Sequence, residues 1–214
     1  MSDATTAHVA VEAPGHDSDK RRQIMVGARE VFLAKGYEGA SMDAIAKAAG
    51  VSKGTLYVYF ASKDVLFEAL IVEEKQILAE NLITFDASGA SLHEELRRIA
   101  INYCELLSMH DHTSSIRMVL GAVEKFPAFG RVFFNAGPQR GVGRLAAYFE
   151  DMVAAGRMEC SNPEAAARHF IALCTSDVLK RSLFAIDPNP SRETIESMVD
   201  EGLAAFARAY GLKS

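Results

Sequence analysis

Four polar side chains lie within seven residues of one another in this 214-residue chain: Lys53, Thr55, Tyr57 and Tyr59. An ammonium group and three hydroxyls on one short helix are the kinds of group that bind phosphate oxygens and base edges of a nucleic acid. Gly54 lies among them, and a residue without a side chain lets the backbone approach a phosphate closely. The types and spacing of these residues therefore favour a nucleic-acid contact.

Two short helices joined by a tight turn are expected to position these residues. Ser41 is a good N-cap for the first helix, and Ile45 and Ala46 supply its apolar face. Gly50 ends that helix because glycine enters the left-handed conformation at little cost, and Ser52 caps the second helix. This is the pattern of a helix-turn-helix, whose second helix lies in the major groove of DNA. An ordinary helical hairpin that ends at a glycine is the alternative.

A longer helix is expected before this motif, from near Asp19 to about Lys35, with Gly36 as its stop. Its first turn carries the basic run 20–22, which opposes the helix dipole. A DNA phosphate backbone alongside would compensate for this unfavourable interaction with the helix dipole. The alternative is that the basic residues are simply solvated. Residues 18–64 hold eight Lys and Arg against five Asp and Glu, a net charge of +3 on a chain of net charge −5. A basic segment on an acidic protein is typical of a DNA-reading head on another kind of body.

The motif residues recur at a familiar spacing. They are Gly36-Tyr37, Ser41, Ile45-Ala46, Gly50-Val51-Ser52, Thr55-Leu56-Tyr57, Tyr59-Phe60, Ser62-Lys63 and Leu66-Phe67. Through them, about residues 20–70 resemble the DNA-binding head of the TetR family of bacterial transcriptional regulators.

That resemblance implies a double-stranded DNA operator as partner, which we expect to be palindromic. The candidate DNA-binding residues are Ser41, Ser52, Lys53, Gly54, Thr55, Tyr57, Tyr59 and Lys63. By resemblance, Ser41 and Lys63 meet phosphates at two flanking helix starts, and residues 53–59 form the recognition helix. Tyr59 stands where the family often has histidine, so a base preference does not carry over.

The rest of the chain is expected to be helical as well. Alanine, leucine, glutamate and arginine dominate, and alternating β-branched residues are scarce, which favours an all-α protein. We expect helices over residues 62–85, 91–107, 114–125, 128–155, 162–184 and 191–210, with a kink at Pro138.

The middle of this helical body is rich in aromatic and methionine side chains. Such residues can enclose an apolar cavity in a helical bundle, and the alternative is that they are ordinary core. The candidate wall residues are Tyr103, Phe129, Phe133 and Phe149. The expected ligand is a small apolar or amphipathic effector.

The last two helices are the candidate dimer interface. In the TetR family they pair with their copies in a four-helix arrangement, and packing within one chain is the alternative. The candidate interface residues are Leu173, Leu179, Met198, Leu203 and Phe206. The body also resembles AefR-like regulators more faintly, through residues 136–145, 168–173 and the terminal helix.

Other kinds of site find little support in the sequence. His110 and His112 flank an acidic residue on an expected polar loop, but this i, i+2 spacing lacks further metal ligands nearby, so we expect neither metal nor cofactor. Three widely spaced cysteines are expected to be reduced thiols, with a redox-sensing role as the alternative. No apolar run is long enough to cross a bilayer and the N-terminus lacks the features of a secretory signal, so we expect a cytoplasmic protein without a membrane partner.

These observations predict an all-α protein in three parts: a disordered tail over 1–17, a DNA-binding domain over 18–62, and a ligand-binding and dimerisation domain over 63–214. The expected function is transcriptional regulation by a homodimer, most often repression in this family, relieved by a small molecule. No nucleophile and base or pair of carboxylates stands at a catalytic spacing, so we expect no enzyme. The alternative is a helical small-molecule-binding protein or enzyme whose head only resembles a helix-turn-helix.

Overall fold

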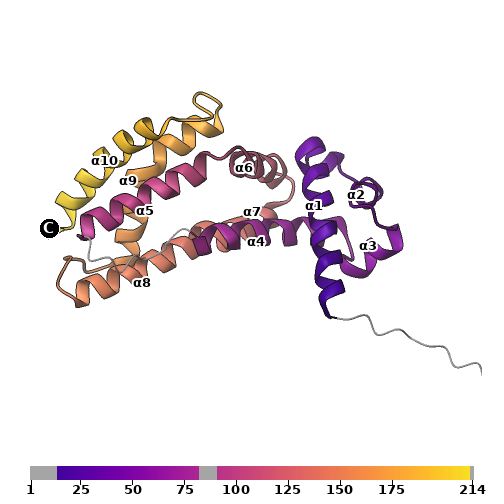
Figure 1. Cartoon of the computed structure of the whole chain (residues 1–214), viewed down its shortest axis with the longest axis horizontal. Helices are drawn as coiled ribbons and strands as arrows, with labels where there is room; N and C mark the ends of the chain where they lie inside the picture. The colour runs from indigo at the N-terminus through magenta and orange to yellow at the C-terminus, as the bar shows by residue number, and fades with distance from the viewer. Residues whose placement is uncertain (1–13, 82–90, 213–214) are drawn as a thin grey trace, which may run out of the picture. The chain divides into compact units, whose positions relative to one another are not determined.

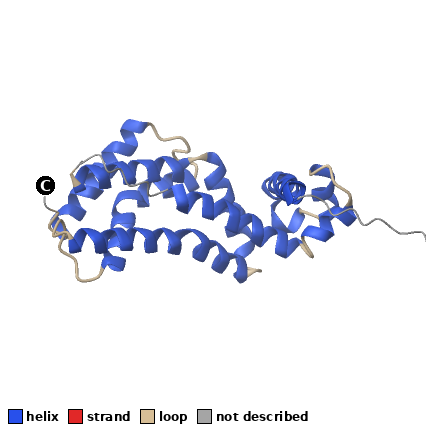
Figure 2. Ribbon diagram, turned by 60° about the horizontal axis from the view of Figure 1, so that its bottom comes forward, coloured by secondary structure: helices blue, strands red, loops and turns tan. Residues whose placement is uncertain are grey.

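A computed structural model describes residues 14–81 and 91–212, and every regular element in those two ranges is a helix (Figures 1 and 2). The helices are α1 (Pro14–Gly39), α2 (Met42–Ala48), α3 (Lys53–Tyr59), α4 (Lys63–Asn81), α5 (Leu92–Ser108), α6 (His110–Val123), α7 (Pro127–Phe134), the π-helix η1 (Asn135–Gln139), α8 (Arg140–Ala154), α9 (Pro163–Leu183) and α10 (Arg192–Ala209). The predicted all-α class is confirmed. None of the described helices is long and apolar enough to cross a membrane.

The chain forms two compact units, residues 1–67 and 68–214, and the division falls inside α4. The first unit contains α1, α2, α3 and the first residues of α4. Its core holds three aromatic rings, with centroids 4.8 Å apart for Phe32 and Phe67 and 4.9 Å apart for Tyr37 and Phe67. The predicted boundary between residues 62 and 63 stays a prediction.

Helix α1 begins earlier than predicted, and its regular part ends at the predicted glycine. Residues 1–13 of the predicted tail lie outside the described residues, but Pro14 already stands at the start of a helix, where its missing N–H is no loss. At the other end, Gly36 has a positive φ of 67°, which breaks the regular helix where the sequence predicts a stop. The residues after Gly36 form only a short additional turn.

The second unit is a helical bundle in which α9 packs against α5, α8 and α10 (Figure 1). Its core is dominated by three phenylalanines. Ring centroids are 6.1 Å apart for Phe149 and Phe170, and Phe206 lies 5.7 Å from Phe149 and 5.3 Å from Phe170. Such aromatic contacts stabilise a core beyond the area that they bury.

Most helix starts were predictable because a side chain caps each of them. Ser91 and Glu94 form a reciprocal capping box at the start of α5. Asn162 accepts a hydrogen bond from the backbone of Ala165 at the start of α9, and Ser191 caps α10 in the same way. The predicted extension of α4 to residue 85 passes beyond Asn81 into residues outside the described ranges.

Two segments differ from their predictions. The stretch from His110 to His112 is not a loop but the first turn of α6, which begins without a side-chain cap. The kink at Pro138 takes the form of η1, a π-helical turn that joins α7 to α8. Since Pro138 has no N–H to donate, the wider turn accommodates it without interrupting the helical path.

Candidate nucleic-acid interface and ligand cavity

The turn between α2 and α3 is fixed by local hydrogen bonds. The Ser41 hydroxyl accepts a hydrogen bond from the backbone N–H of Ala44 at the start of α2. Gly50 has a φ of 64°, and the N–H of Val51 then donates to the carbonyl of Ala46 at 3.0 Å. These contacts close a helix-turn-helix, as the sequence predicts.

Helix α1 holds this turn from the other side. The Gln23 side-chain amide donates to the carbonyl of Ala49 at 2.7 Å. A Cβ atom added at Gly27 would come within 2.5 Å of the Ala49 backbone nitrogen, so only glycine permits this approach. Gln23 and Gly27 therefore position the motif, and neither was a candidate from the sequence.

Helix α3 turns one face inward and leaves the other exposed. Leu56 is fully buried, whereas Lys53, Gly54 and Tyr57 are exposed and Val58 is 82% exposed. Single exposed apolar residues are common on protein surfaces, and the apolar surface of Val58 is of a kind that can contact a thymine methyl group. No feature of the sequence separates Val58 from the buried apolar residues around it except its place on the helix.

The remaining candidates on α3 are partly engaged with each other. Ser52 caps the helix by accepting from the Thr55 N–H at 3.0 Å, and the two hydroxyls of these residues lie 2.8 Å apart. Thr55 and Tyr59 are half-buried. The hydroxyls of Ser52 and Thr55 are thus engaged at the start of α3.

Lys53 makes an ion pair with Asp43, at 2.6 Å between Nζ and Oδ1, and both side chains are largely exposed. The hydrogen bond to Asp43, followed by its charge, raises the pKa of Lys53. Because the pair is solvent-screened, a phosphate can compete with the carboxylate for this ammonium group.

Lys63 stands at the start of α4, as the resemblance implies, and its contact with a phosphate stays a prediction. Its ammonium group donates to the carbonyls of Tyr37 at 2.8 Å and Ala40 at 3.0 Å, and it lies 4.3 Å from the centroid of the Tyr37 ring. Two of its three donors thus bind the end of α1 to the start of α4. The geometry gives Lys63 a structural role inside the first unit.

A small apolar cavity of about 110 Å³ lies within the second unit. Of the four candidate wall residues, Tyr103 and Phe133 line it. Phe129 and Phe149 do not: Phe149 is fully buried in the aromatic core, and Phe129 stacks on Phe126 with centroids 5.5 Å apart. Phe129 and Phe149 are therefore ordinary core residues and do not line the cavity.

Two polar residues that were not predicted from the sequence, Lys75 and His112, also line this cavity. Lys75 is only 2% exposed, and its ammonium group lies 4.6 Å from the centroid of the Phe133 ring. Burial, and then the charge of Lys75, lowers the pKa of His112 to about 3. The only hint in the sequence is that Lys75 follows the buried Ile71 by four residues, on the same face of α4.

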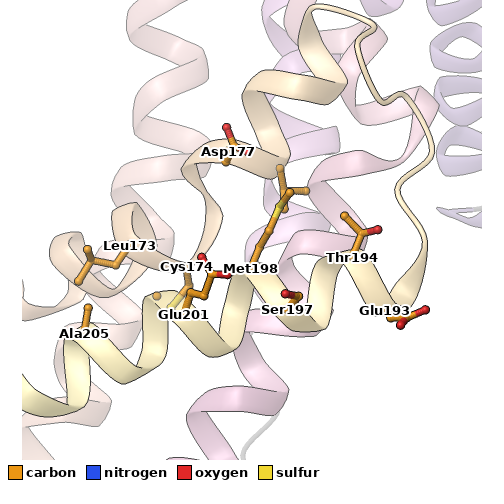
Figure 3. A pocket seen from close by; sticks show the side chains of 11 residues that line it. Leu173, Cys174, Asp177, Glu193, Thr194, Ser197, Met198, Glu201 and Ala205 are labelled. Carbon is orange, nitrogen blue, oxygen red and sulfur yellow. The ribbon is translucent and has the colours of Figure 1, made fainter.

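A separate surface groove of about 770 Å³ runs between α9 and α10 (Figure 3). Leu173 and Met198, two of the candidate interface residues, line it. A Cβ atom at Gly202 would lie 2.4 Å from the Leu173 carbonyl oxygen, so glycine is required for the two helices to approach this closely. The lining of the groove is mixed: apolar and small residues lie beside the carboxylates of Asp177, Glu193 and Glu201.

The other three candidate interface residues lie elsewhere. Leu203 and Phe206 are fully buried in the core of the single chain, where they offer no surface to a second copy. Leu179 lines the cavity beside Lys75. Leu203 and Phe206 repeat at helical spacing like interface residues, and the sequence cannot tell one buried face from another.

The cysteines and acidic residues show no built metal or redox centre. Among the residues that the structure describes, no group of three or more His, Cys, Asp or Glu side chains converges as a metal site would require. Cys104 and Cys174 are buried, and burial raises the pKa of each thiol to about 12. A thiol in this state is a poor nucleophile, which disfavours redox sensing at these two positions.

The fold and the exposed α3 define a helix-turn-helix protein with a separate helical body. Two family models match the chain: bacterial regulatory proteins of the TetR family over residues 24–70, and the C-terminal domain of AefR-like transcriptional repressors over residues 94–212. The second covers more than half of the chain. This protein therefore belongs to the TetR family of transcriptional regulators, with an AefR-like C-terminal domain.

Individual relatives agree with this assignment. UidR of Escherichia coli K12 is 43% identical over 56 residues, which are 26% of this chain and 29% of UidR. The repressor AcnR of Corynebacterium glutamicum is 36% identical over 72 residues, 34% of this chain and 38% of AcnR. The chain thus matches only about a quarter to a half of the length of such curated relatives.

Solved structures match over almost the whole chain. The flavonoid-responsive regulator FrrA is 34% identical, with a TM-score of 0.80, and the match covers 90% of this chain and 97% of FrrA. A TetR-family regulator from Mesorhizobium loti is 24% identical, with a TM-score of 0.83 over 93% of this chain and 99% of its own. The latter similarity shows the fold alone.

Proposed function

We propose that this protein regulates transcription by binding a double-stranded DNA operator through α3. The proposed DNA-binding domain is residues 18–62, and the proposed ligand-binding and dimerisation domain is residues 63–214. The proposal fits the family, in which such regulators act on bacterial genes in the cytoplasm. Lys53 and Ser41 are proposed to bind phosphates, and Tyr57, Val58 and Tyr59 to contact bases.

The observation that carries the proposal is the position of Gly54. A Cβ atom there would meet no protein atom closer than the Ser52 hydroxyl oxygen at 3.8 Å, so packing within the unit does not require glycine. In a helix, glycine is less stable than alanine by about 0.5–1 kcal/mol. A costly glycine on an exposed helix face is explained if another molecule, such as a phosphate backbone, must approach there.

We further propose that the protein acts as a homodimer through α9 and α10. The lining of the groove in Figure 3 includes Leu173, Met198 and Ala205, with the acidic residues Asp177, Glu193 and Glu201 beside them. An isologous pairing of this surface would bury the exposed Leu173 side chain. Two heads in one dimer read paired half-sites, which gives the operator its two-fold symmetry.

The proposed regulation is repression that a small apolar or amphipathic effector relieves. Three findings support it: the cavity in the second unit, the repressor family to which the C-terminal domain belongs, and the flavonoid response for which FrrA is named. An effector acts only through different affinities for the two states of the protein, and such coupling is typically about 1–3 kcal/mol.

Selection of random duplexes with the purified protein, followed by sequencing, tests the proposal. The expected result is an enriched palindrome whose affinity falls steeply as salt concentration rises, because phosphate contacts release counterions. Recovery of no enriched sequence and no salt-dependent retention would contradict it. The protein would then be a helical small-molecule-binding protein or enzyme.

A further inference from the structure

The cavity in the second unit combines an apolar wall with one buried lysine side chain. Its lining includes Leu106, Leu107, Ile116 and Phe133, which offer only hydrocarbon surface. The described residues around it include Lys75 and no acidic side chain. Among the described residues that line the cavity, Lys75 is the one with an ammonium group.

Contacts with Gly137 and Phe133 hold the Lys75 side chain in position. The stem of Lys75 runs along the backbone at Gly137, where an added Cβ atom would lie 3.4–3.5 Å from the lysine Cβ, Cγ and Cδ atoms. The aromatic face of Phe133 lies on the ammonium end, 4.6 Å away. A side chain already held in this way loses little conformational freedom when a ligand binds.

The other polar groups of the cavity are neutral. Burial and the neighbouring Lys75 keep His112 unprotonated, with a pKa of about 3. Burial raises the pKa of Tyr103 to about 12, so its phenol remains protonated. Both can take part in hydrogen bonds with a ligand, and neither carries a charge near neutral pH.

We propose that this cavity binds a small apolar molecule that carries one acidic group, and that the Lys75 ammonium group binds that acid as its counter-cation. In a cavity poor in water, the attraction between opposite charges is stronger than at the surface. The apolar wall binds the rest of the molecule and the lysine selects for the acid. The role of this molecule as effector rests on the regulatory function proposed above.

The volume limits the size of the ligand. An engineered cavity of about 150 Å³ in another protein takes up benzene, so about 110 Å³ suits a single ring or a short chain. The acidic group is a carboxylate or a phenolate, since both present an anionic oxygen to an ammonium group. Suitable probes are benzoate and butyrate as carboxylates and 4-nitrophenolate as a phenolate.

Matched pairs test the selection for the acid. Benzoate is compared with benzamide, and butyrate with butyramide, by calorimetric titration of the full-length protein at pH 7.5 and 150 mM salt. The expected result is that at least one acid binds at least tenfold more tightly than its amide, or that 4-nitrophenolate binds at least tenfold more tightly than 4-nitroanisole, its neutral counterpart. The tighter class identifies the acidic group. Equal affinity for acid and amide in both pairs, with no binding of 4-nitrophenolate, would overturn the proposal without any variant.

Lys75→Met tests the residue, because methionine keeps the apolar stem and removes the charge. The acid-to-amide ratio should fall at least tenfold in this variant and remain unchanged in Lys180→Met, an exposed lysine on α9. If Lys75→Met folds and keeps the ratio, the assignment of Lys75 is wrong.

Binding of the selected duplex by the two proteins is measured in parallel. Without a probe, wild type and Lys75→Met should bind it equally, and the acid should weaken the binding of wild type alone. If wild type binds no duplex but still prefers acids, the proposed regulatory function fails and the cavity assignment stands. If it binds duplex but shows no preference for acids, only the cavity assignment fails.

Discussion

Gly54 is a residue at which stability and DNA binding are expected to oppose each other. In Gly54→Ala, the free energy of unfolding should rise by up to about 0.5–1 kcal/mol, because alanine favours the helix and meets no close protein atom. Affinity for the selected duplex should fall at least tenfold. Thermal unfolding and a duplex titration measure the two effects.

The control is Gly121→Ala on α6, where an added Cβ atom also meets nothing within 4 Å. That variant should gain stability without any change in DNA affinity. If Gly54→Ala binds duplex as wild type does, the backbone of α3 does not approach DNA at this position.

Lys53 and Tyr57 should lose different parts of DNA binding. Lys53→Ala should weaken binding to the selected duplex and to random duplex by similar factors, since a phosphate contact carries no sequence information. Tyr57→Ala should cost about 1–3 kcal/mol on the selected site and less on random duplex. Titrations of both variants against both duplexes compare the losses, and equal losses for Tyr57→Ala would contradict a base contact.

His112 should contribute to acid sensitivity. Its folded pKa of about 3 lies below the ordinary value of 6.5, so the unfolded chain binds the proton more readily. The stability that neutral His112 preserves is complete above pH 6.5 and is lost as pH falls toward 3. Relative to His112→Gln, wild type should lose stability with a slope that approaches about 1.4 kcal/mol per pH unit below pH 6.

Denaturant unfolding of both proteins between pH 7.5 and 5 measures this difference. Carboxylates that titrate in the same range affect both proteins, so the comparison isolates His112. Parallel stability curves for the two proteins would mean that His112 becomes protonated in the folded state without penalty.

At the scale of helices, the surface of α9 is expected to hold the dimer together. Leu173 is 44% exposed and lies in the groove between α9 and α10 (Figure 3). Leu173→Glu should weaken dimerisation about 10- to 100-fold, because two copies of a leucine that is 44% exposed each lose about half of the roughly 1.5–3 kcal/mol that full burial contributes. Sedimentation at micromolar concentration measures the assembly state, and affinity for the selected duplex should fall with it.

The matched control is Leu120→Glu on α6, since Leu120 is 58% exposed and lies outside the groove. It should leave both dimerisation and DNA binding unchanged. A Leu173→Glu protein that remains dimeric would place the interface on another surface.

The sequence predicts best those helices whose starts are capped by a nearby side chain. Ser52, Ser91, Asn162 and Ser191 each cap a helix by accepting a backbone hydrogen bond three residues on. Helix α6 was mispredicted at its start because Met109 makes no side-chain cap there. A start of that kind depends on tertiary packing, which leaves no local pattern.

The two candidate sites, the exposed face of α3 and the cavity, also differ in how far they depend on local sequence. The exposed face of α3 follows from a motif in which each residue has a local role, so the sequence is enough to find it. The cavity depends on which residues of distant helices meet, and the sequence found Tyr103 and Phe133 but missed Lys75 and His112. Hydrophobic periodicity treats a lysine on a helix as exposed, whereas here the fold buries it.

For the molecule as a whole, the symmetry of a dimer predicts the symmetry of its DNA site. Selected duplexes should contain two inverted half-sites, and each dimer should bind one such pair. When one half-site is scrambled, one head loses all of its specific base contacts and binds that half only non-specifically. The affinity should therefore fall by orders of magnitude and not merely twofold. Duplex titrations with intact and half-scrambled sites measure this; equal affinity for both would contradict two-headed binding.

The π-helical turn η1 bears on how such a protein can change over evolution. A π-turn closes its hydrogen bond one residue later than an α-turn, so it accommodates one additional residue while the helices on either side keep their faces. Gly137 and Pro138 of this turn form part of the cavity wall. Deletion of the codon for Pro138 would restore a regular helix and leave α7 and α8 in register. The shape of the cavity, and with it the molecule that fits, can therefore change in one genetic step while the rest of the helical bundle is inherited unaltered.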